Sequence, residues 1–595
     1  MTTLQGPPRE REETTEDRPV RRRRGLFEII SLVLAAGMAV LFLYPVVNVA
    51  VGAVFVDGRF SPDGFINALS SPELPGVLTN TVIVMVCAGT ASVVIGTVFA
   101  WLNERTDARL GFLGTLLPLV PLMLPPVALS IGWFFLAQPS TGYLNVLIRT
   151  LSPWHDVDGT GPLNIGTWPG LVWVYTLHLV PFAYLAVSAA FRNVDPALEE
   201  ASRVSGSGLL RTLWKVSLPA VRPAIGAAFL LVSLSSIALY SIPTIIGTTA
   251  RIEVLSVHIV RLVRLTFPSR IYEGVVLSFV MMAMLLVVWF IQQRLSGNGR
   301  HSRIGGKATQ ATLVRLGPWK WVARVFMIGY LVAASLLPLA ALLLVSLSPY
   351  WSTNISLDSL GFGNFVELWT RNVNARNALT TSLVLGLVGA TLGMAIAAIM
   401  MTQAQNSSGG VRRFLEGVTK SPGAISNIII GVAFLITYSG APFHLYGTVL
   451  ILLLAYLVIY LPQASVQAST AIQQIGPELM EASAMSGASR GRTFWRISFP
   501  LMLPGLAAGW AMLFVLMVGD LTASALLAGT RNPVVGFVIL GIFENGALTQ
   551  LAALAVIICV ISSVVVGLVL TLAGRGRSAK RRRRRFATPV TPVSR

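Results

Sequence analysis

The chain has 595 residues, of which 54% are hydrophobic and only 12% carry a charge. Length alone would allow about three or four soluble domains, but apolar runs of about 20 residues recur throughout, and each can cross a bilayer as a helix. The composition therefore excludes a soluble enzyme or a soluble binding module. We expect an all-α, polytopic protein of the cell membrane.

The net charge of +20 is concentrated at Arg21–Arg24, in a connector near the middle of the chain, and at Lys580–Arg585. A basic excess can indicate nucleic-acid binding, but in a protein with many spans it is more typical of the cytoplasmic side, beside anionic lipid headgroups. We therefore expect the bilayer, and no nucleic acid, as a partner. Cys87 and Cys559 lie in apolar runs without metal or redox spacing and are interpreted as small buried hydrophobic residues.

Hydropathy divides the chain into two transmembrane domains, 25–294 and 321–574, each with six expected spans. Residues 1–24 are interpreted as a disordered cytoplasmic tail, 295–320 as a flexible cytoplasmic linker and 575–595 as a basic cytoplasmic tail. Six spans in each half place both termini on the same, cytoplasmic side. The expected spans are 26–55, 77–101, 111–138, 167–192, 220–247 and 272–293, then 322–348, 377–402, 412–438, 446–470, 503–529 and 549–573.

One outward-facing stretch is difficult to reconcile with this charge rule. The segment from Arg251 to Arg270 carries four arginines, although the count of spans places it outside. The spacing of its charges favours an amphipathic helix that lies at the membrane interface. The alternative is a segment that lines the mouth of a pathway.

A repeated segment is the most informative feature of the sequence. Residues 200–219 align with residues 481–500 without a gap, because both ends differ by 281. A polar loop with no partner has no physical reason to keep its spacing in both halves, so we expect it to bind something. The identical residues are Glu200, Ala201, Ser202, Ser205, Gly206, Arg211, Thr212, Trp214, Ser217 and Pro219, which recur as Glu481, Ala482, Ser483, Ser486, Gly487, Arg492, Thr493, Trp495, Ser498 and Pro500.

Local signals predict that each copy forms two short helices around a bend, which we call an elbow. In the first copy, Asp195 caps the first helix and Pro196 occupies its first position. Gly206 ends that helix in a left-handed conformation, Ser207 caps the second helix, and Pro219 limits it. The second copy offers Pro477, Gly487 and Ser489 for the same roles.

The repeated segment resembles the cytoplasmic loop of permease subunits in binding-protein-dependent ABC importers. That family's pattern is E-A-A, three residues, Gly, nine residues, and I-x-L-P. This chain departs from the pattern in three ways. Ser replaces the second Ala in both copies, Val replaces Ile in the first copy, and Phe replaces Leu in the second. The pattern is filled by Glu200, Ala201, Ser202, Gly206, Val216, Leu218 and Pro219, and by Glu481, Ala482, Ser483, Gly487, Ile497, Phe499 and Pro500.

The resemblance implies a fused permease with two six-helix halves and the fold of a type I ABC importer. Each elbow would dock in a cleft of a separate ATP-binding subunit, present in two copies, and an extracytoplasmic binding protein would deliver the solute. No cofactor is implied. By the resemblance, Glu200 and Glu481 would supply charge at the contact with the ATP-binding subunit, and Gly206 and Gly487 would form the bend of each elbow. Ala201 and Ala482 would allow the subunit to approach closely.

The chain is not expected to be an enzyme. A P-loop requires G-x-x-x-x-G-K-[ST], and the nearest match, Gly306-Lys307, is followed by Ala308. No zincin or nucleophile-elbow motif is present either. The ATPase must therefore be a separate polypeptide.

The solute is less well defined than the class of transporter. The single-chain, twelve-span form most resembles ferric-iron permeases and then thiamine permeases, while aminophosphonate, polyamine and oxyanion importers have similar loops. No cluster of His, Tyr or carboxylates indicates an iron site. The alternative class, an ion-coupled secondary transporter, would predict several paired charges at membrane depth.

Asp520 is the clearest ionisable group at membrane depth and the candidate pathway residue. It could contact a cationic solute or steady a helix break near Gly519. The favoured alternative is a hydrogen bond that only packs helices together. The counterpart of Asp520 by the offset of 281 is Leu239. Glu544 lies in a short outer segment before the last span and is expected to be solvated.

Overall fold

In the computed structural model, helices account for most of the residues that are described. The described residues are 25–52, 55–56, 59–60, 62–111, 114, 120–151, 159–296, 313–353, 357–473, 475, 479, 482–483 and 485–585. Within them the named strands are the two-residue β1 (Phe55–Val56) and β2 (Arg59–Phe60). Nine helices in this part of the chain are long and apolar enough to span a membrane, and two bent helix pairs could add two more. The predicted all-α, polytopic membrane fold is confirmed.

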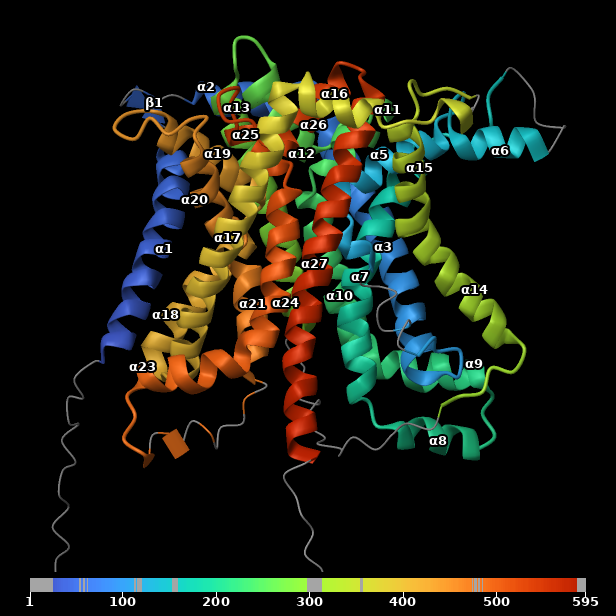
Figure 1. Ribbon diagram of the computed structural model, residues 1–595, viewed down its shortest axis with the longest axis vertical. Coiled ribbons are helices and arrows are strands. Elements are labelled where there is room, and N and C mark those ends of the chain that lie inside the picture. Colours follow the sequence, from blue (N-terminus) through green and yellow to red (C-terminus); the bar gives the residue numbers. More distant parts are fainter. Residues whose placement is uncertain are drawn as a thin grey trace, which may run out of the picture.

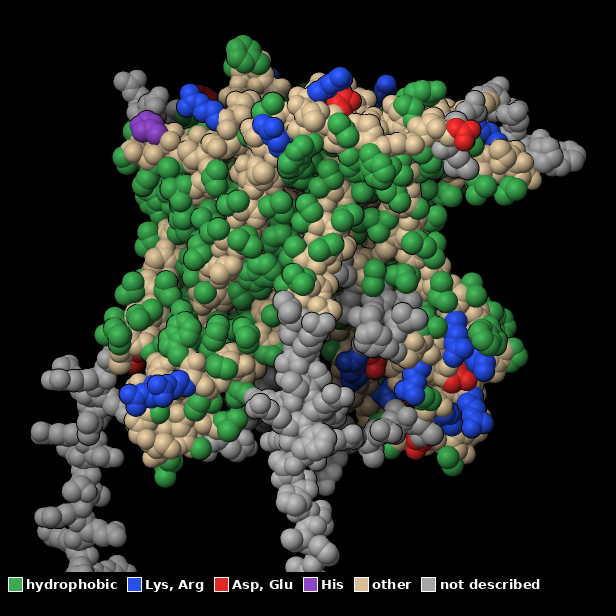
Figure 2. Space-filling model, in the orientation of Figure 1, with side chains coloured by type: hydrophobic (Ala, Val, Ile, Leu, Met, Phe, Trp, Pro, Cys, Tyr) green, Lys and Arg blue, Asp and Glu red, His purple; other side chains and the backbone are tan. Residues whose placement is uncertain are grey.

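The long helices stand side by side between two polar ends (Figure 1). Figure 2 shows an apolar belt between these ends, while the Lys, Arg, Asp and Glu side chains gather above and below it. The first half contributes α1 (Leu26–Gly52), α3 (Leu74–Arg105), α7 (Trp168–Asn193), α10 (Leu218–Ala238) and α13 (Ile271–Ser296). The second contributes α14 (Trp319–Leu331) with α15 (Leu337–Leu347), α17 (Val373–Gln405), α20 (Val449–Ile459) with α21 (Leu461–Gln473), α24 (Phe499–Val518) and α27 (Leu548–Arg585).

The third span of the second half is not the straight helix that we expected over 412–438. Helix α18 (Gly409–Lys420), followed by a 3-10 turn, is bent by 98° from α19 (Asn427–Ser439). Glu416 on α18 pairs with Arg412 at 2.8 Å and with Lys420 at 3.3 Å. These charges favour an aqueous surface over a bilayer. In the first half, the described part of this span is η1 (Val120–Met123) and α5 (Pro126–Ala137).

The two halves exchange their first helices. Helix α1 lies against α17 and α19 of the second half, and α15 lies against α5 of the first (Figure 1). Asn48 on α1 donates a hydrogen bond to Thr437 at 3.0 Å. Gly132 on α5 leaves no room for a side chain, because a Cβ there would lie 2.6 Å from Cβ of Pro338. The expected domains 25–294 and 321–574 are therefore interlocked rather than separate.

The fifth span of each half breaks before it reaches the outer end. We expected continuous spans over 220–247 and 503–529, but α10 ends at Ala238 and α24 ends at Val518. The chain then folds back through short helices, which form the outer segments, residues 243–265 and 522–544. The first contains η4 (Pro243–Gly247), α11 (Thr248–Ala250), α12 (Leu255–Val260) and η5 (Arg261–Leu265), and the second contains α25 (Thr522–Leu527) and α26 (Val535–Glu544).

Equivalent hydroxyl groups hold both outer segments. Thr81 Oγ1 on α3 accepts a hydrogen bond from the backbone N–H of Leu255 at 2.9 Å. Ser382 Oγ on α17 accepts one from the N–H of Val535, also at 2.9 Å. Each hydroxyl thus satisfies a donor at the beginning of a buried helix, which neither water nor lipid could do there.

The interfacial helix expected within 251–270 is not formed. The segment folds into α12 and η5, and the side chains of Leu255, His258 and Ile259 are buried in protein rather than turned to lipid. Arg261 pairs with Glu253 at 2.8 Å and with Glu73. Protein carboxylates, not lipid headgroups, therefore take up this charge.

The end of the expected linker is fixed in place. Residues 297–312 lie outside the described residues, but the N–H of Val314 donates to Arg105 O at 2.9 Å, and the N–H of Asp107 donates to Val314 O at 3.0 Å. The linker thus docks on the turn that follows α3. The tail expected over 1–24 lies outside the described residues, and α27 continues to Arg585, so the described part of the basic tail is helical.

Candidate functional site

Both elbows lie at one end of the molecule. Helix α8 of the first elbow and α23 of the second are found there, together with the start of α1 and the end of α27 (Figure 1). This arrangement agrees with the expectation that the elbows and both termini share one side. We call this end the inner end.

The bend of the first elbow follows its local signals. Helix α8 (Pro196–Val204) begins where the Asp195 carboxylate accepts the N–H of Ala197 at 2.9 Å, and Gly206 ends it at φ +84°. The capping role expected of Ser207 is wrong: α9 (Leu209–Thr212) begins after Gly208, with no side-chain cap. Ser207 instead donates its N–H to Ser202 O at 3.1 Å and so completes the end of α8.

The second arm of each elbow continues into the membrane. We expected Pro219 to limit the first of these helices, but Pro219 and its counterpart Pro500 both lie inside continuous helices, Leu209–Ala238 and Gly491–Val518. A π-helical turn, Leu213–Ser217 or Phe494–Ser498, precedes each proline. Such a turn shifts the backbone pairing by one residue, which relieves the loss of the proline N–H. Each elbow is therefore the base of a membrane helix.

The second elbow repeats this geometry where it is described. Gly487 has φ +71°, and Ser489 Oγ accepts the N–H of Arg492 at 3.4 Å, at the start of α23 (Arg490–Thr493). The predicted roles of Gly487 and Ser489 are thus confirmed. Glu481 and Pro477 lie outside the described residues.

A hydroxyl pair joins the two arms of each elbow. Ser202 Oγ lies 3.0 Å from Thr212 Oγ1, and Ser483 Oγ lies 2.7 Å from Thr493 Oγ1. These serines stand where the family pattern has alanine, and their hydroxyls reach across the bend to hold its angle. All four residues are among the identities of the repeat, but the sequence alone did not indicate that they pair.

Apolar side chains are exposed at equivalent positions on both elbows. Leu198 and Leu479 are 55% and 49% exposed, Val204 and Met485 89% and 90%, and Trp214 and Trp495 70% and 60%. Exposed apolar side chains that are grouped in this way are typical of a surface that another protein covers. We call these two sets the apolar patches. Glu200, Ala201 and Ala482, which the sequence singled out, are exposed beside them.

A buried charge pair anchors the first elbow, and the sequence reasoning missed it. Glu199 on α8 and Arg105 at the end of α3 are both 4% exposed, with Arg105 Nε 3.6 Å from Glu199 Oε1. Ser217 Oγ donates to the same carboxylate oxygen at 2.8 Å. Arg105 Nη2 also donates to the carbonyl oxygens of Phe191 and Val194, each at 2.7 Å. The pair thus connects the elbow with α3, with the end of α7 and with the π turn.

Asp520 joins two helix breaks in the second half. Tyr460, between α20 and α21, donates its hydroxyl to Asp520 Oδ1 at 3.0 Å. Oδ2 accepts the N–H of Ser524 at 3.0 Å, in the first turn of α25. This geometry supports the expectation that the carboxylate steadies the break near Gly519. Its contact with a solute stays a prediction.

Comparisons with known proteins identify both halves. Residues 92–297 and 389–581 each match the family model described as "Binding-protein-dependent transport system inner membrane component". The ferric transport system permease protein FbpB of Actinobacillus pleuropneumoniae is 23% identical over 550 residues, which cover 90% of this chain and 77% of the relative. The Fe(3+)-transport system permease protein FbpB 2 of Haemophilus influenzae is 23% identical over 467 residues, covering 78% of this chain and 83% of the relative.

A solved bacterial ABC transporter involved in the import of alginate is also similar to this chain. The identity is 17%, the match covers 43% of this chain and 98% of that one, and the TM-score is 0.36. A similarity of this size adds nothing to the assignment of the family.

Proposed function

Because this chain belongs to the family of inner membrane components of binding-protein-dependent transport systems, we propose that its elbows couple a separate ATPase to solute movement. The chain is the permease subunit of an ABC importer. What we propose is how the elbows act in transport, which partners they bind and which solute the importer carries.

The apolar patches carry the proposal. They recur at equivalent positions on two elbows that are built alike, and both lie at the inner end of the molecule. Because the two patches are equivalent, each would bind an equivalent partner. Each elbow would therefore bind one copy of an ATP-binding subunit. Glu200, and Glu481 by the resemblance, would add charge at the edge of each contact.

The elbow geometry favours transmission of movement. The second arm of each elbow is continuous with α10 or α24, so a displacement of the elbow moves a whole membrane helix. At their outer ends these helices break, at Leu239 and near Asp520, and lead into the outer segments. Movement at the inner end would in this way reach the outer mouth.

We propose ferric iron as the solute, delivered to the outer end by an extracytoplasmic binding protein. The support is that two ferric permeases match 90% and 78% of this chain. Thiamine, an aminophosphonate, a polyamine or an oxyanion are the alternatives within the same class of importer. Both termini would then be cytoplasmic, with the elbows.

The test replaces the exposed tryptophans. Trp214→Glu together with Trp495→Glu should abolish co-purification of the ATPase and reduce uptake of radiolabelled ferric iron at least tenfold, because a charge replaces an apolar contact on each elbow. Insertion into the membrane should be unchanged. The control is Trp369→Glu, a tryptophan that is 56% exposed on α16 (Gly363–Thr370) at the outer end. Normal ATPase capture by the double variant would exclude docking at the patches.

A further inference from the structure

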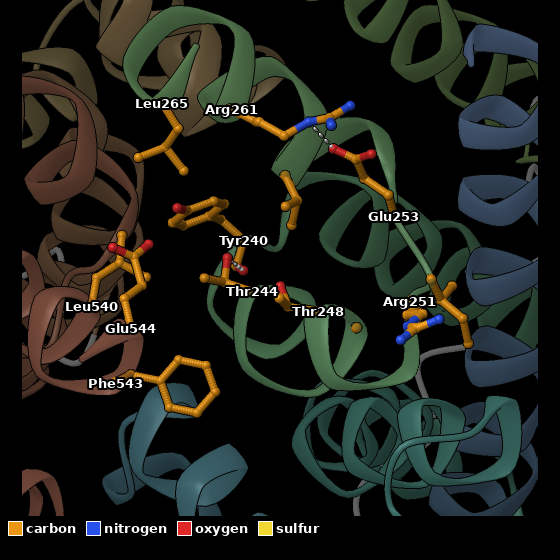
Figure 3. Close-up of a pocket in the computed structure, with 13 residues that line it drawn as sticks. Tyr240, Thr244, Thr248, Arg251, Glu253, Arg261, Leu265, Leu540, Phe543 and Glu544 are labelled. Carbon is orange, nitrogen blue, oxygen red and sulfur yellow. Dashed lines mark hydrogen bonds and ion pairs between the residues drawn. The ribbon is translucent and has the colours of Figure 1, made fainter. Parts of the chain in front are cut away.

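A cavity of about 380 Å³ lies between the outer segments of the two halves. The first half contributes Tyr240, Thr244, Thr248 and Arg251, and α26 of the second half contributes Phe543 and Glu544. Figure 3 shows these side chains around the open centre of the cavity. The cavity therefore has one wall from each half, at the end where a solute would be delivered.

Some of the charges at the cavity neutralise one another. Arg261 pairs with Glu253 at 2.8 Å and with Glu73, and His258 Nδ1 lies 3.0 Å from Arg261 Nη2. Glu73, Glu253 and His258 are close enough together to resemble a set of metal ligands. A guanidinium already occupies that position, so we do not assign a metal ion to it.

Two further charges have no such partner. Among the described residues, no hydrogen bond or ion pair involves the side chain of Arg251 or of Glu544, and Figure 3 shows them on opposite walls. Arg251 has φ +55°, a conformation that costs an arginine energy and a glycine almost none. The N–H of Ile252, bound to Gly247 O at 2.8 Å, closes this turn.

We propose that this cavity binds a small solute carrying a negative and a positive group, the negative group on Arg251 and the positive group on Glu544. Because Arg261 is already paired with carboxylates, the lining leaves one positive and one negative group for a solute, Arg251 and Glu544. A bare ion would find a like charge on one of the two walls, whereas a dipolar solute finds a partner for each of its charges.

The inference rests on the proposed function, because it gives the transported solute a site on the permease itself. Two kinds of solute share the required chemistry. One is a ferric ion that arrives with a small oxyanion, and the other is a zwitterion such as an aminophosphonate. Because the walls belong to different halves, a relative movement of the halves would make or break the site.

The experiment measures binding by the full chain in lipid nanodiscs. Ferric citrate and 2-aminoethylphosphonate are the probes, with citrate alone as a further arm. Binding of one probe should weaken at least tenfold in Arg251→Gln and in Glu544→Gln, and Arg251→Lys and Glu544→Asp should recover part of it. The controls are Arg371→Gln and Glu367→Gln, which change charges of the outer end on α16 and beside it, away from the cavity.

The three probes distinguish the two kinds of solute, and they separate failure of this site from failure of the iron assignment. Binding of ferric citrate but not of citrate alone identifies the metal complex, and binding of 2-aminoethylphosphonate identifies the zwitterion. No binding of any probe to the wild type, or equal binding by the variants, overturns the proposal. If the wild type binds the zwitterion but imports no iron, the iron assignment fails and the site stands.

Discussion

The two elbows share one shape but are attached to the membrane helices in different ways. In the first half, Arg105 pairs with Glu199, and Glu104 pairs with Arg192 at 2.8 Å. The equivalence of Thr81 and Ser382 places Asn406 and Gln405 at the positions of Arg105 and Glu104. The offset of 281 places Met480 and Gln473 at the positions of Glu199 and Arg192, and all four counterparts are uncharged.

In the part of the second elbow that the structure describes, aromatic packing provides an attachment. Phe494, in its π turn, lies 5.1 Å from Phe27 between ring centroids, and Phe27 belongs to the exchanged helix α1 of the first half. The first elbow has Leu213 at the position of Phe494. Within the described residues, a buried charge pair thus fixes the first elbow to its own half, and an apolar contact joins the second elbow to the other half. A repeat can keep one surface while its two copies contact different helices.

The largest effect should come from breaking the charge pair. Arg105→Ala leaves a buried carboxylate without its cation and should lower the free energy of unfolding by about 3–5 kcal/mol. Asn406→Ala, at the equivalent position, should cost about 0.5 kcal/mol or less. Thermal unfolding of the purified chain in detergent, with iron uptake measured in parallel, provides the comparison.

A double variant sharpens this test. Arg105→Asn with Glu199→Met gives the first half the residues of the second, and it should recover most of the stability because no unpaired charge remains buried. Equal loss in the single and double variants would show that shape, rather than charge pairing, holds the first elbow.

A smaller effect should follow at the aromatic contact. Phe494→Leu gives the second elbow the residue of the first and should cost about 1.5 kcal/mol through lost ring packing against Phe27. Thermal unfolding of the purified chain in detergent is the measurement, and the same change should cost less in a Phe27→Ala background, because no ring then faces residue 494. The reverse change, Leu213→Phe, is made on the elbow that the charge pair attaches and serves as the control.

The smallest effect should be the same in both halves. Ser202→Ala and Ser483→Ala each remove one hydroxyl of the pair that spans the bend and should cost about 1 kcal/mol. Hydrogen exchange of the elbow amides is the suitable measurement. A large difference between the two variants would contradict the view that the elbows differ in their attachment and not in their bend.

Local chemistry allowed much of the elbow to be predicted from the sequence. Asp195 caps a helix, and Gly206 and Gly487 end one, because those roles depend on residues within one turn. Hydropathy likewise predicted the membrane spans, since the thickness of a bilayer sets the length of an apolar run. Pro219 was misinterpreted, because a π turn in the preceding residues changes what a proline does to a helix.

Only the tertiary structure decided which helices meet. The breaks after Ala238 and Val518 are tolerated because hydroxyls on α3 and α17 pair with the buried backbone of α12 and α26, and no hydropathy profile records that pairing. Arg105 and Glu199 are 94 residues apart in sequence, so no local pattern could join them. The exchange of α1 and α15 and the cavity between the halves also depend on which helix faces come together in the membrane. Packing between distant segments has no signature within either segment.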